Sequence, residues 1–240
     1  MTIKVKNIEI SYIQYGEGED VVLLHGWGQN IKMMDPIGEK LKNKYRVTIV
    51  DLPGHGDTKE PESPITIYDY ADIVKEFLEK LNIENPIIIG HSFGGRIGII
   101  YASLYKTKKL ILLGAPCIRA KQHDGLKVKT LKTLKKVPLL NKLEGFAKRH
   151  IGSRDYRNAS EVMRKILVNT VNEDLTECAK KIKCPTLLIW GTNDTEAPIE
   201  DAQKLEKIIA DCGLVVYEGG SHYTYLEFLI PVCKVIKTFI

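Results

Sequence analysis

Short, continuous apolar runs recur along the chain, and they are typical of strands buried on both faces of a parallel sheet. Each run is followed within two residues by Gly, Pro or Asp, which favour turns. Residues 8–15 alternate more strongly and end at Gly16-Glu17-Gly18, a pattern that predicts an antiparallel lead-in strand. The continuous runs lie at 21–24, 47–50, 87–89, 110–113 and 186–190, and residues 214–217 fit a further strand.

Helical periodicity marks the segments between these runs. From Thr66 to Leu81, apolar residues recur at helical spacing and form one stripe, and Thr66 with Asp69 resembles a capping box. Residues 94–105 and 199–210 are also predicted to be helical. Strands that alternate with helices predict an α/β fold with a mostly parallel, doubly wound sheet.

One stretch, from Cys117 to Lys181, interrupts the alternation because it contains no good strand and is rich in lysine. We therefore expect residues 1–116 and 182–240 to form the α/β core, and residues 117–181 to form an inserted helical lid. Between residues 120 and 150, nine basic residues stand against two acidic ones.

Composition and charge narrow the possible functions. A chain of 240 residues with 44% hydrophobic and 27% charged residues suits one globular α/β domain. No apolar run approaches the roughly 18–20 residues that span a bilayer, and the N-terminus has no signal-peptide pattern, so we expect a cytoplasmic protein with no membrane partner. The net charge of +5 is mild and argues for no nucleic-acid partner. The five cysteines include no Cys-x-x-Cys pair, so neither a zinc site nor a disulfide framework is indicated.

A Gly-x-Ser-x-Gly motif follows the run at 87–89, in the order Gly90-His91-Ser92-Phe93-Gly94, and precedes a predicted helix. Strand, turn and helix in this order are the setting of a nucleophile elbow. Such a tight turn strains the backbone at Ser92, lifts its hydroxyl above the sheet edge and leaves no room for side chains at 90 and 94. We therefore predict that Ser92 is a catalytic nucleophile.

A serine hydroxyl is a poor nucleophile without a base, and His222 is the predicted base. It follows the last predicted strand in a loop with Gly219 and Gly220. It also comes after the serine, which fits a catalytic triad whose members follow the chain order nucleophile, acid, histidine. The remaining histidines precede or adjoin Ser92 or lie in the predicted lid: His25, His55, His91, His123 and His150.

The third member of the triad should be an acid that follows a core strand between the serine and the histidine. Asp194 meets this condition, because it lies in the turn after the run at 186–190. It would fix the tautomer of the imidazole and stabilise the imidazolium that forms. Glu196 and Asp201 are the competing acids, and Asp201 is predicted to lie in the next helix.

An oxyanion hole needs two backbone N–H groups. Phe93, directly after the nucleophile, should supply one, and Trp27, in the glycine-flanked loop after residues 21–24, should supply the other. The side chains of Trp27 and Phe93 are expected to line the substrate site. The motif at residues 51–56, Asp-Leu-Pro-Gly-His-Gly, is interpreted as a structural turn.

Together these motifs resemble the α/β-hydrolase superfamily over residues 8–116 and 182–240, and most of all its compact branch of carboxylesterases, carbon–carbon bond hydrolases, prolyl iminopeptidases and pimeloyl-carrier-protein methyl esterases. The resemblance implies a serine hydrolase without metal or organic cofactor that cleaves a carboxylic ester of a small acyl substrate. Epoxide hydrolases and haloalkane dehalogenases of this superfamily use an aspartate nucleophile, and Ser92 argues against both.

Several alternatives stay open. Carbon–carbon hydrolases and aminopeptidases share the core, and a ligand receptor or scaffold of the same fold needs no activity. The basic excess between residues 120 and 150 could attract an acidic acyl carrier protein, although lysine-rich helices are usually only solvated.

Overall fold

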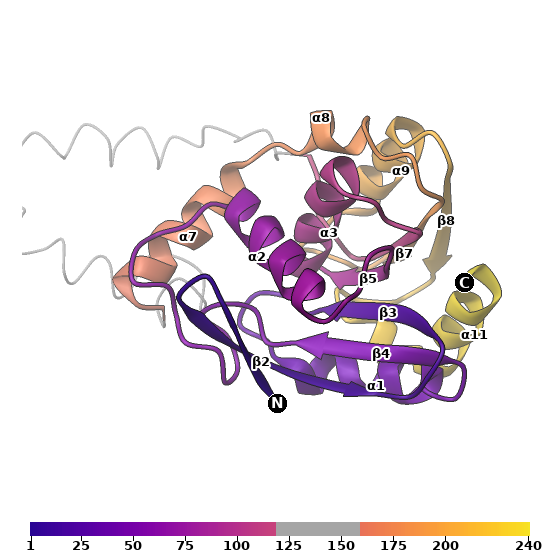
Figure 1. Ribbon diagram of the computed structural model, residues 1–240. Helices are drawn as coiled ribbons and strands as arrows, with labels where there is room; N and C mark the ends of the chain where they lie inside the picture. Colours follow the sequence, from indigo (N-terminus) through magenta and orange to yellow (C-terminus); the bar gives the residue numbers. More distant parts are fainter. Residues whose placement is uncertain (119–158) are drawn as a thin grey trace, which may run out of the picture.

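The computed structural model describes residues 1–118 and 159–240, which build one eight-stranded sheet with helices on both faces (Figure 1). The strand order is β1-β2-β4-β3-β5-β6-β7-β8. β2 pairs antiparallel with β1 and β4, and the six strands β4, β3, β5, β6, β7 and β8 pair in parallel in that order. The strands are β1 (Thr2–Val5), β2 (Ile8–Tyr15), β3 (Glu19–Leu24), β4 (Tyr45–Val50), β5 (Ile87–His91), β6 (Lys109–Leu113), β7 (Thr186–Gly191) and β8 (Cys212–Tyr217).

Side chains alternate between two cores along the central strands, as the pleat requires. In β3, Val22 and Leu24 face one core, whereas Val21 and Leu23 face the other. The first core packs against α2, α3 and α9, and the second packs against α1 and α11 (Figure 1). The helices are α1 (Ile31–Leu41), α2 (Ile67–Lys80), α3 (Phe93–Leu104), α7 (Glu161–Asn172), α8 (Thr176–Ala179), α9 (Ile199–Ile208), α10 (Thr224–Glu227) and α11 (Leu229–Phe239).

The predicted fold class and its main elements are confirmed. Each predicted strand is present, and residues 8–15 form the antiparallel lead-in strand β2. Thr66 and Asp69 form the capping box of α2, in which the Thr66 N–H donates to Asp69 Oδ2 at 2.7 Å. The hydrophobic pattern missed α1, which begins at the N-cap Asn30 and contains Pro36, a residue that disfavours helix interiors. It also missed β1, α10 and α11.

The expected lid falls largely outside the described residues. Within 117–181, the structure describes residues 117–118 and 159–181, where it has α7 and α8 and no strand. The basic segment between residues 120 and 150 lies outside the described part of the chain. The domain boundaries therefore stay a prediction.

A buried arginine joins the segment that follows β6 to the end of α7. Arg96 in α3 is only 4% exposed, and its guanidinium donates hydrogen bonds to the backbone oxygens of Pro116, Thr170 and Glu173 at 2.6, 2.9 and 2.6 Å. The segment after β6 and the end of α7 thus meet at α3, because one guanidinium satisfies carbonyls from both.

Close packing of α3 against β3 depends on Gly94. A Cβ at this position would lie 2.3 Å from the carbonyl oxygen of Leu24, which is far inside van der Waals contact. The loop that follows β3 and the start of α3 can meet only because position 94 has no side chain.

We predict that Gly94→Ala destabilises the fold because backbone atoms must separate to admit the new methyl group. Overpacking of this kind costs about 1–3 kcal/mol, or a fall in melting temperature of several degrees, measured by thermal unfolding. Gly213→Ala is the matched control, because a Cβ there meets nothing within 4 Å. Equal melting temperatures for the two variants would contradict this account.

Candidate active site

Ser92 occupies the sharp turn between β5 and α3. Its backbone has φ 48° and ψ −112°, a conformation that is costly for a residue with a side chain. The turn is held at both ends, because the Ser92 N–H donates to the Leu113 oxygen at 3.0 Å and the Ser92 oxygen accepts from the Arg96 N–H at 3.0 Å. A Cβ at Gly90 would lie 2.6 Å from the Gly94 oxygen, so the predicted crowding across the elbow is present.

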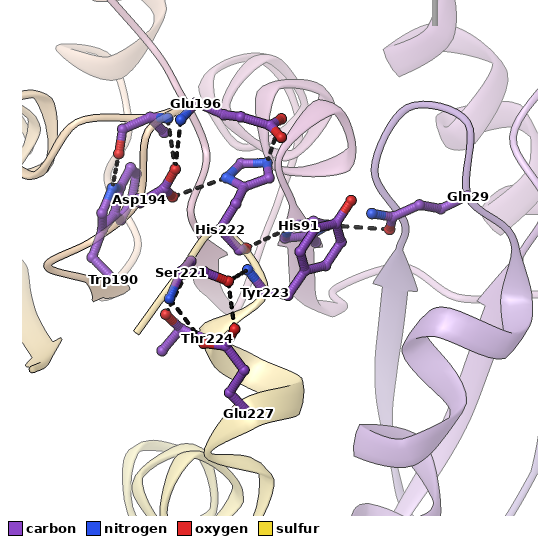
Figure 2. A network of polar contacts seen from close by, with 11 residues as sticks. Gln29, His91, Trp190, Asp194, Glu196, Ser221, His222, Tyr223, Thr224 and Glu227 are labelled. Atoms are coloured by element: carbon purple, nitrogen blue, oxygen red, sulfur yellow. Dashed lines mark hydrogen bonds and ion pairs between the residues drawn. The ribbon is translucent and has the colours of Figure 1, made fainter. Parts of the chain in front are cut away.

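Asp194 and His222 lie in direct contact with each other (Figure 2). The distance between His222 Nδ1 and Asp194 Oδ2 is 2.8 Å, and both side chains are buried. The other carboxylate oxygen of Asp194 accepts from the backbone N–H groups of Glu196 and Ala197 at 2.9 and 2.8 Å. Both oxygens of Asp194 are therefore occupied, so the carboxylate is held in a single orientation toward the imidazole.

The loops after β7 and β8 are joined to each other, and this junction positions the Asp194–His222 pair. The Asn193 N–H donates to the Gly220 oxygen at 2.8 Å. A Cβ at Gly191 would lie 2.1 Å from that same oxygen, so the loops approach closely where Gly191 has no side chain. Ser221 is anchored separately, because its N–H donates to Glu227 Oε2 at 2.8 Å. The loop that carries His222 is thus restrained by hydrogen bonds at Gly220 and at Ser221, the two residues before the histidine.

The structure brings together two members of the predicted triad more tightly than the third. His222 and Asp194 lie close to Gly114, where a Cβ would be 3.2 Å from His222 Nδ1. Gly114 directly follows β6, the strand that hydrogen-bonds the Ser92 turn. Within the described residues no hydrogen bond joins the Ser92 hydroxyl to His222. Instead, His222 Nε2 lies 3.4 Å from Glu196 Oε2 (Figure 2).

His91 was not predicted as a site residue, yet it contacts the loop that carries His222. Its ring lies 3.0 Å, through Nε2, from the backbone oxygen of His222. Its Nδ1 lies 3.2 Å from Gln29 Oε1, which accepts from the Gly26 N–H at 3.0 Å (Figure 2). Burial lowers the pKa of His91 to about 3, so its ring stays neutral at neutral pH. His91 therefore connects the loop after β3 with the loop that carries His222. Its position directly before Ser92 was the feature of the sequence that could have indicated this role.

The two predicted oxyanion donors come from adjacent segments. Phe93 is the first residue of α3, and Trp27 lies in the loop after β3 that packs against Gly94. Within the described residues neither backbone N–H has a hydrogen-bond acceptor, as a site for an incoming oxyanion requires. Their rings form an edge-to-face pair with centroids 5.2 Å apart. Phe93 is buried and Trp27 is half-buried, so Trp27 is the ring that a ligand could reach from this side.

Three comparisons with known proteins agree with the fold described above. A protein-family model described as the alpha/beta hydrolase fold matches residues 21–127. The solved structure of an esterase from Exiguobacterium antarcticum superimposes with a TM-score of 0.80 at 24% identity, covering 99% of this chain and 98% of that one. The protein has the α/β-hydrolase fold.

Curated relatives of this α/β-hydrolase-fold protein extend over nearly the whole chain. AB hydrolase superfamily protein YisY of Bacillus subtilis is 28% identical, with 88% of both chains covered. The pimeloyl-[acyl-carrier protein] methyl ester esterase of Aliivibrio fischeri strain MJ11 is 27% identical, covering 94% of this chain and 95% of that protein. The resemblance to the superfamily is thereby confirmed, and the relatives support a hydrolase. No described helix is both long and apolar enough to cross a membrane.

Other carboxylates of the core have structural contacts of their own. Asp51 Oδ1 accepts from the Ile31 N–H at 2.8 Å and its Oδ2 accepts from the Asp57 N–H at 2.9 Å. The Asp51 carboxylate therefore stabilises the loop after β4, which supports the interpretation of residues 51–56 as a structural turn. Asp201 lies in α9 and pairs with Lys204 at 2.9 Å. Neither carboxylate is bonded to His222.

His25 supports the same region as a neutral ring. It is fully buried, and its Nε2 accepts from the Leu52 N–H at 3.0 Å while its Nδ1 lies 2.7 Å from the Gly26 oxygen. Burial, together with the neighbouring His55, lowers the pKa of His25 to about 3 from its ordinary value of 6.5. A proton on Nε2 would remove the acceptor that Leu52 needs.

We predict that this histidine makes the fold acid-sensitive. Because the folded-state pKa is lowered, the unfolded chain takes up a proton first, so stability falls as pH drops below about 6.5 toward 3. The slope contributed by one such group is about 1.4 kcal/mol per pH unit. Urea unfolding at pH 7.5 and pH 5 should show a larger loss for the native protein than for His25→Phe. The same loss in both would contradict the assignment.

Proposed function

We propose that the protein is a serine hydrolase that cleaves a carboxylic ester, or a similar acyl bond, of a small substrate. The observation that carries this proposal is the buried 2.8 Å contact between Asp194 and His222, together with the strained Ser92 turn. Strain of this kind persists only where the surrounding structure enforces it, and it is common at catalytic nucleophiles.

The proposed reaction is a two-step acyl transfer. Ser92 Oγ attacks the substrate carbonyl while His222 Nε2 accepts the hydroxyl proton, and the imidazolium that forms is stabilised by Asp194 through Nδ1. The N–H groups of Trp27 and Phe93 donate to the tetrahedral oxyanion. His222 then protonates the leaving alcohol, the acyl-enzyme forms, and a water molecule activated by His222 releases the acid. No step needs a metal or an organic cofactor.

His222 must move its Nε2 contact from Glu196 to Ser92 for this reaction to begin. Catalytic hydrogen bonds are often long or absent without substrate and tighten in the complex. Asp194 supports this proposal as the orienting acid better than Glu196 does, because Asp194 is buried and holds Nδ1, whereas Glu196 is exposed and faces the nitrogen that must exchange protons.

Other chemistries of the same core remain alternatives. Carbon–carbon hydrolases and aminopeptidases use the same triad, and a receptor or scaffold would keep the fold without turnover. Rates on short-chain esters, vinylogous diketones and amino-acyl amides separate the three enzyme classes, and we expect the esters to be turned over fastest. A protein that turns over none of them would fit the receptor alternative.

We predict that Ser92→Ala lowers the kcat of p-nitrophenyl ester hydrolysis by at least about 10³-fold, because the nucleophile is lost. The melting temperature should not fall, because the substitution does not increase the backbone strain. Initial rates and thermal unfolding check both parts. Ser103→Ala in α3 is the control, since that hydroxyl donates only to the Ile100 oxygen nearby. Turnover by Ser92→Ala at the native rate would refute the assignment.

An acidic acyl carrier protein is the proposed macromolecular partner. Two features support it: the excess of basic residues between 120 and 150, and the similarity to an esterase whose name specifies a carrier-bound pimeloyl methyl ester. We expect kcat/KM for a carrier-linked methyl ester to exceed that for the free ester, and the advantage to shrink as salt screens the charges. An equal kcat/KM for both at low salt would remove the carrier protein as a partner. The expected cytoplasmic location stays a prediction.

A further inference from the structure

Glu196 is an exposed carboxylate that lies against the functional nitrogen of His222. Its backbone N–H belongs to the turn that holds Asp194, donating to Asp194 Oδ1 at 2.9 Å. Its side chain reaches back over the imidazole, so that Oε2 lies 3.4 Å from His222 Nε2 (Figure 2). The side chain is 64% exposed, in contrast to the buried Asp194. Within the described residues no lysine or arginine pairs with Glu196.

The two nitrogens of His222 therefore face two carboxylates with different surroundings. Nδ1 is committed to Asp194 at 2.8 Å, so it takes no part in proton exchange with a substrate. Nε2 must receive the Ser92 proton and deliver it to the leaving group, which requires the leaving oxygen to lie within hydrogen-bond distance of Nε2. A leaving group in that position is a close neighbour of the Glu196 carboxylate.

We propose that Glu196 is a specificity-determining residue that selects leaving groups by charge. It favours an alcohol that carries a cationic group near the scissile bond and disfavours one that carries an anionic group. This inference rests on the proposed hydrolase function and adds a substrate class to it. The physical basis is Coulombic. A positive charge on the leaving group a few ångströms from the partly exposed carboxylate is attracted to it, and a negative charge is repelled. Each effect is large enough to alter kcat/KM by about tenfold.

The experiment compares three esters of one acyl group. The leaving alcohols are choline, its uncharged isostere 3,3-dimethylbutanol, and isethionate, which carries a sulfonate. We expect the native protein to prefer choline over the neutral ester and the neutral ester over isethionate. In Glu196→Gln, the ratio of kcat/KM for choline to that for isethionate should fall by about 10-fold to 100-fold, and the neutral ester is the internal reference for any change in the basal rate. Raising the salt concentration should reduce the native ratio.

Glu200→Gln is the matched control, because it removes the same charge from an exposed position in the first turn of α9 and does not contact His222. A purely structural role for Glu196 would alter all three esters alike and leave the ratio unchanged. If Glu196→Gln and Glu200→Gln keep the native ratio, the selectivity proposal is overturned while the hydrolase stands. If no ester shows turnover that depends on Ser92, the hydrolase proposal fails and the inference fails with it.

Discussion

The hydrogen bond between His222 Nδ1 and Asp194 Oδ2 ties together the loops that follow β7 and β8, and the arrangement of the whole site depends on it. Parallel strands bring their carboxyl ends to one edge of the sheet, so the loops that carry residues 92, 194 and 222 lie at the same edge although they are far apart in sequence. The junction of Gly191 with Gly220 fixes how closely the two loops approach. β5, two strands from β7 in the sheet, ends at the same edge and carries Ser92 there.

Local motifs made much of this arrangement predictable. Gly90 and Gly94 carry a steric requirement that can be read from five residues, and the structure has the expected crowding at both. The capping box at Thr66 was equally local. The helix α1 could not be predicted in the same way, because Pro36 is unfavourable in a helix interior. The helix is stabilised instead by the packing of Met34 and Ile37 into the core.

Side-chain contacts between distant loops were beyond the reach of the sequence. Chain order pointed to His222, but nothing local indicates that His91 would contact its backbone oxygen across 131 positions. By sequence position Glu196 competes with Asp194 for the same role, whereas in the structure the two acids face opposite nitrogens of one ring. That division depends on how the turn after β7 directs each side chain, which is a property of the folded loop.

Covalent labelling tests most directly whether Ser92 is a nucleophile activated by His222. A fluorophosphonate reacts fastest with an activated serine, and mass spectrometry of the digested protein locates the adduct. We predict one adduct, on Ser92, that forms much more slowly in His222→Ala and Asp194→Asn. Absence of an adduct, or an adduct on another residue that forms equally fast in Ser92→Ala, would contradict the account.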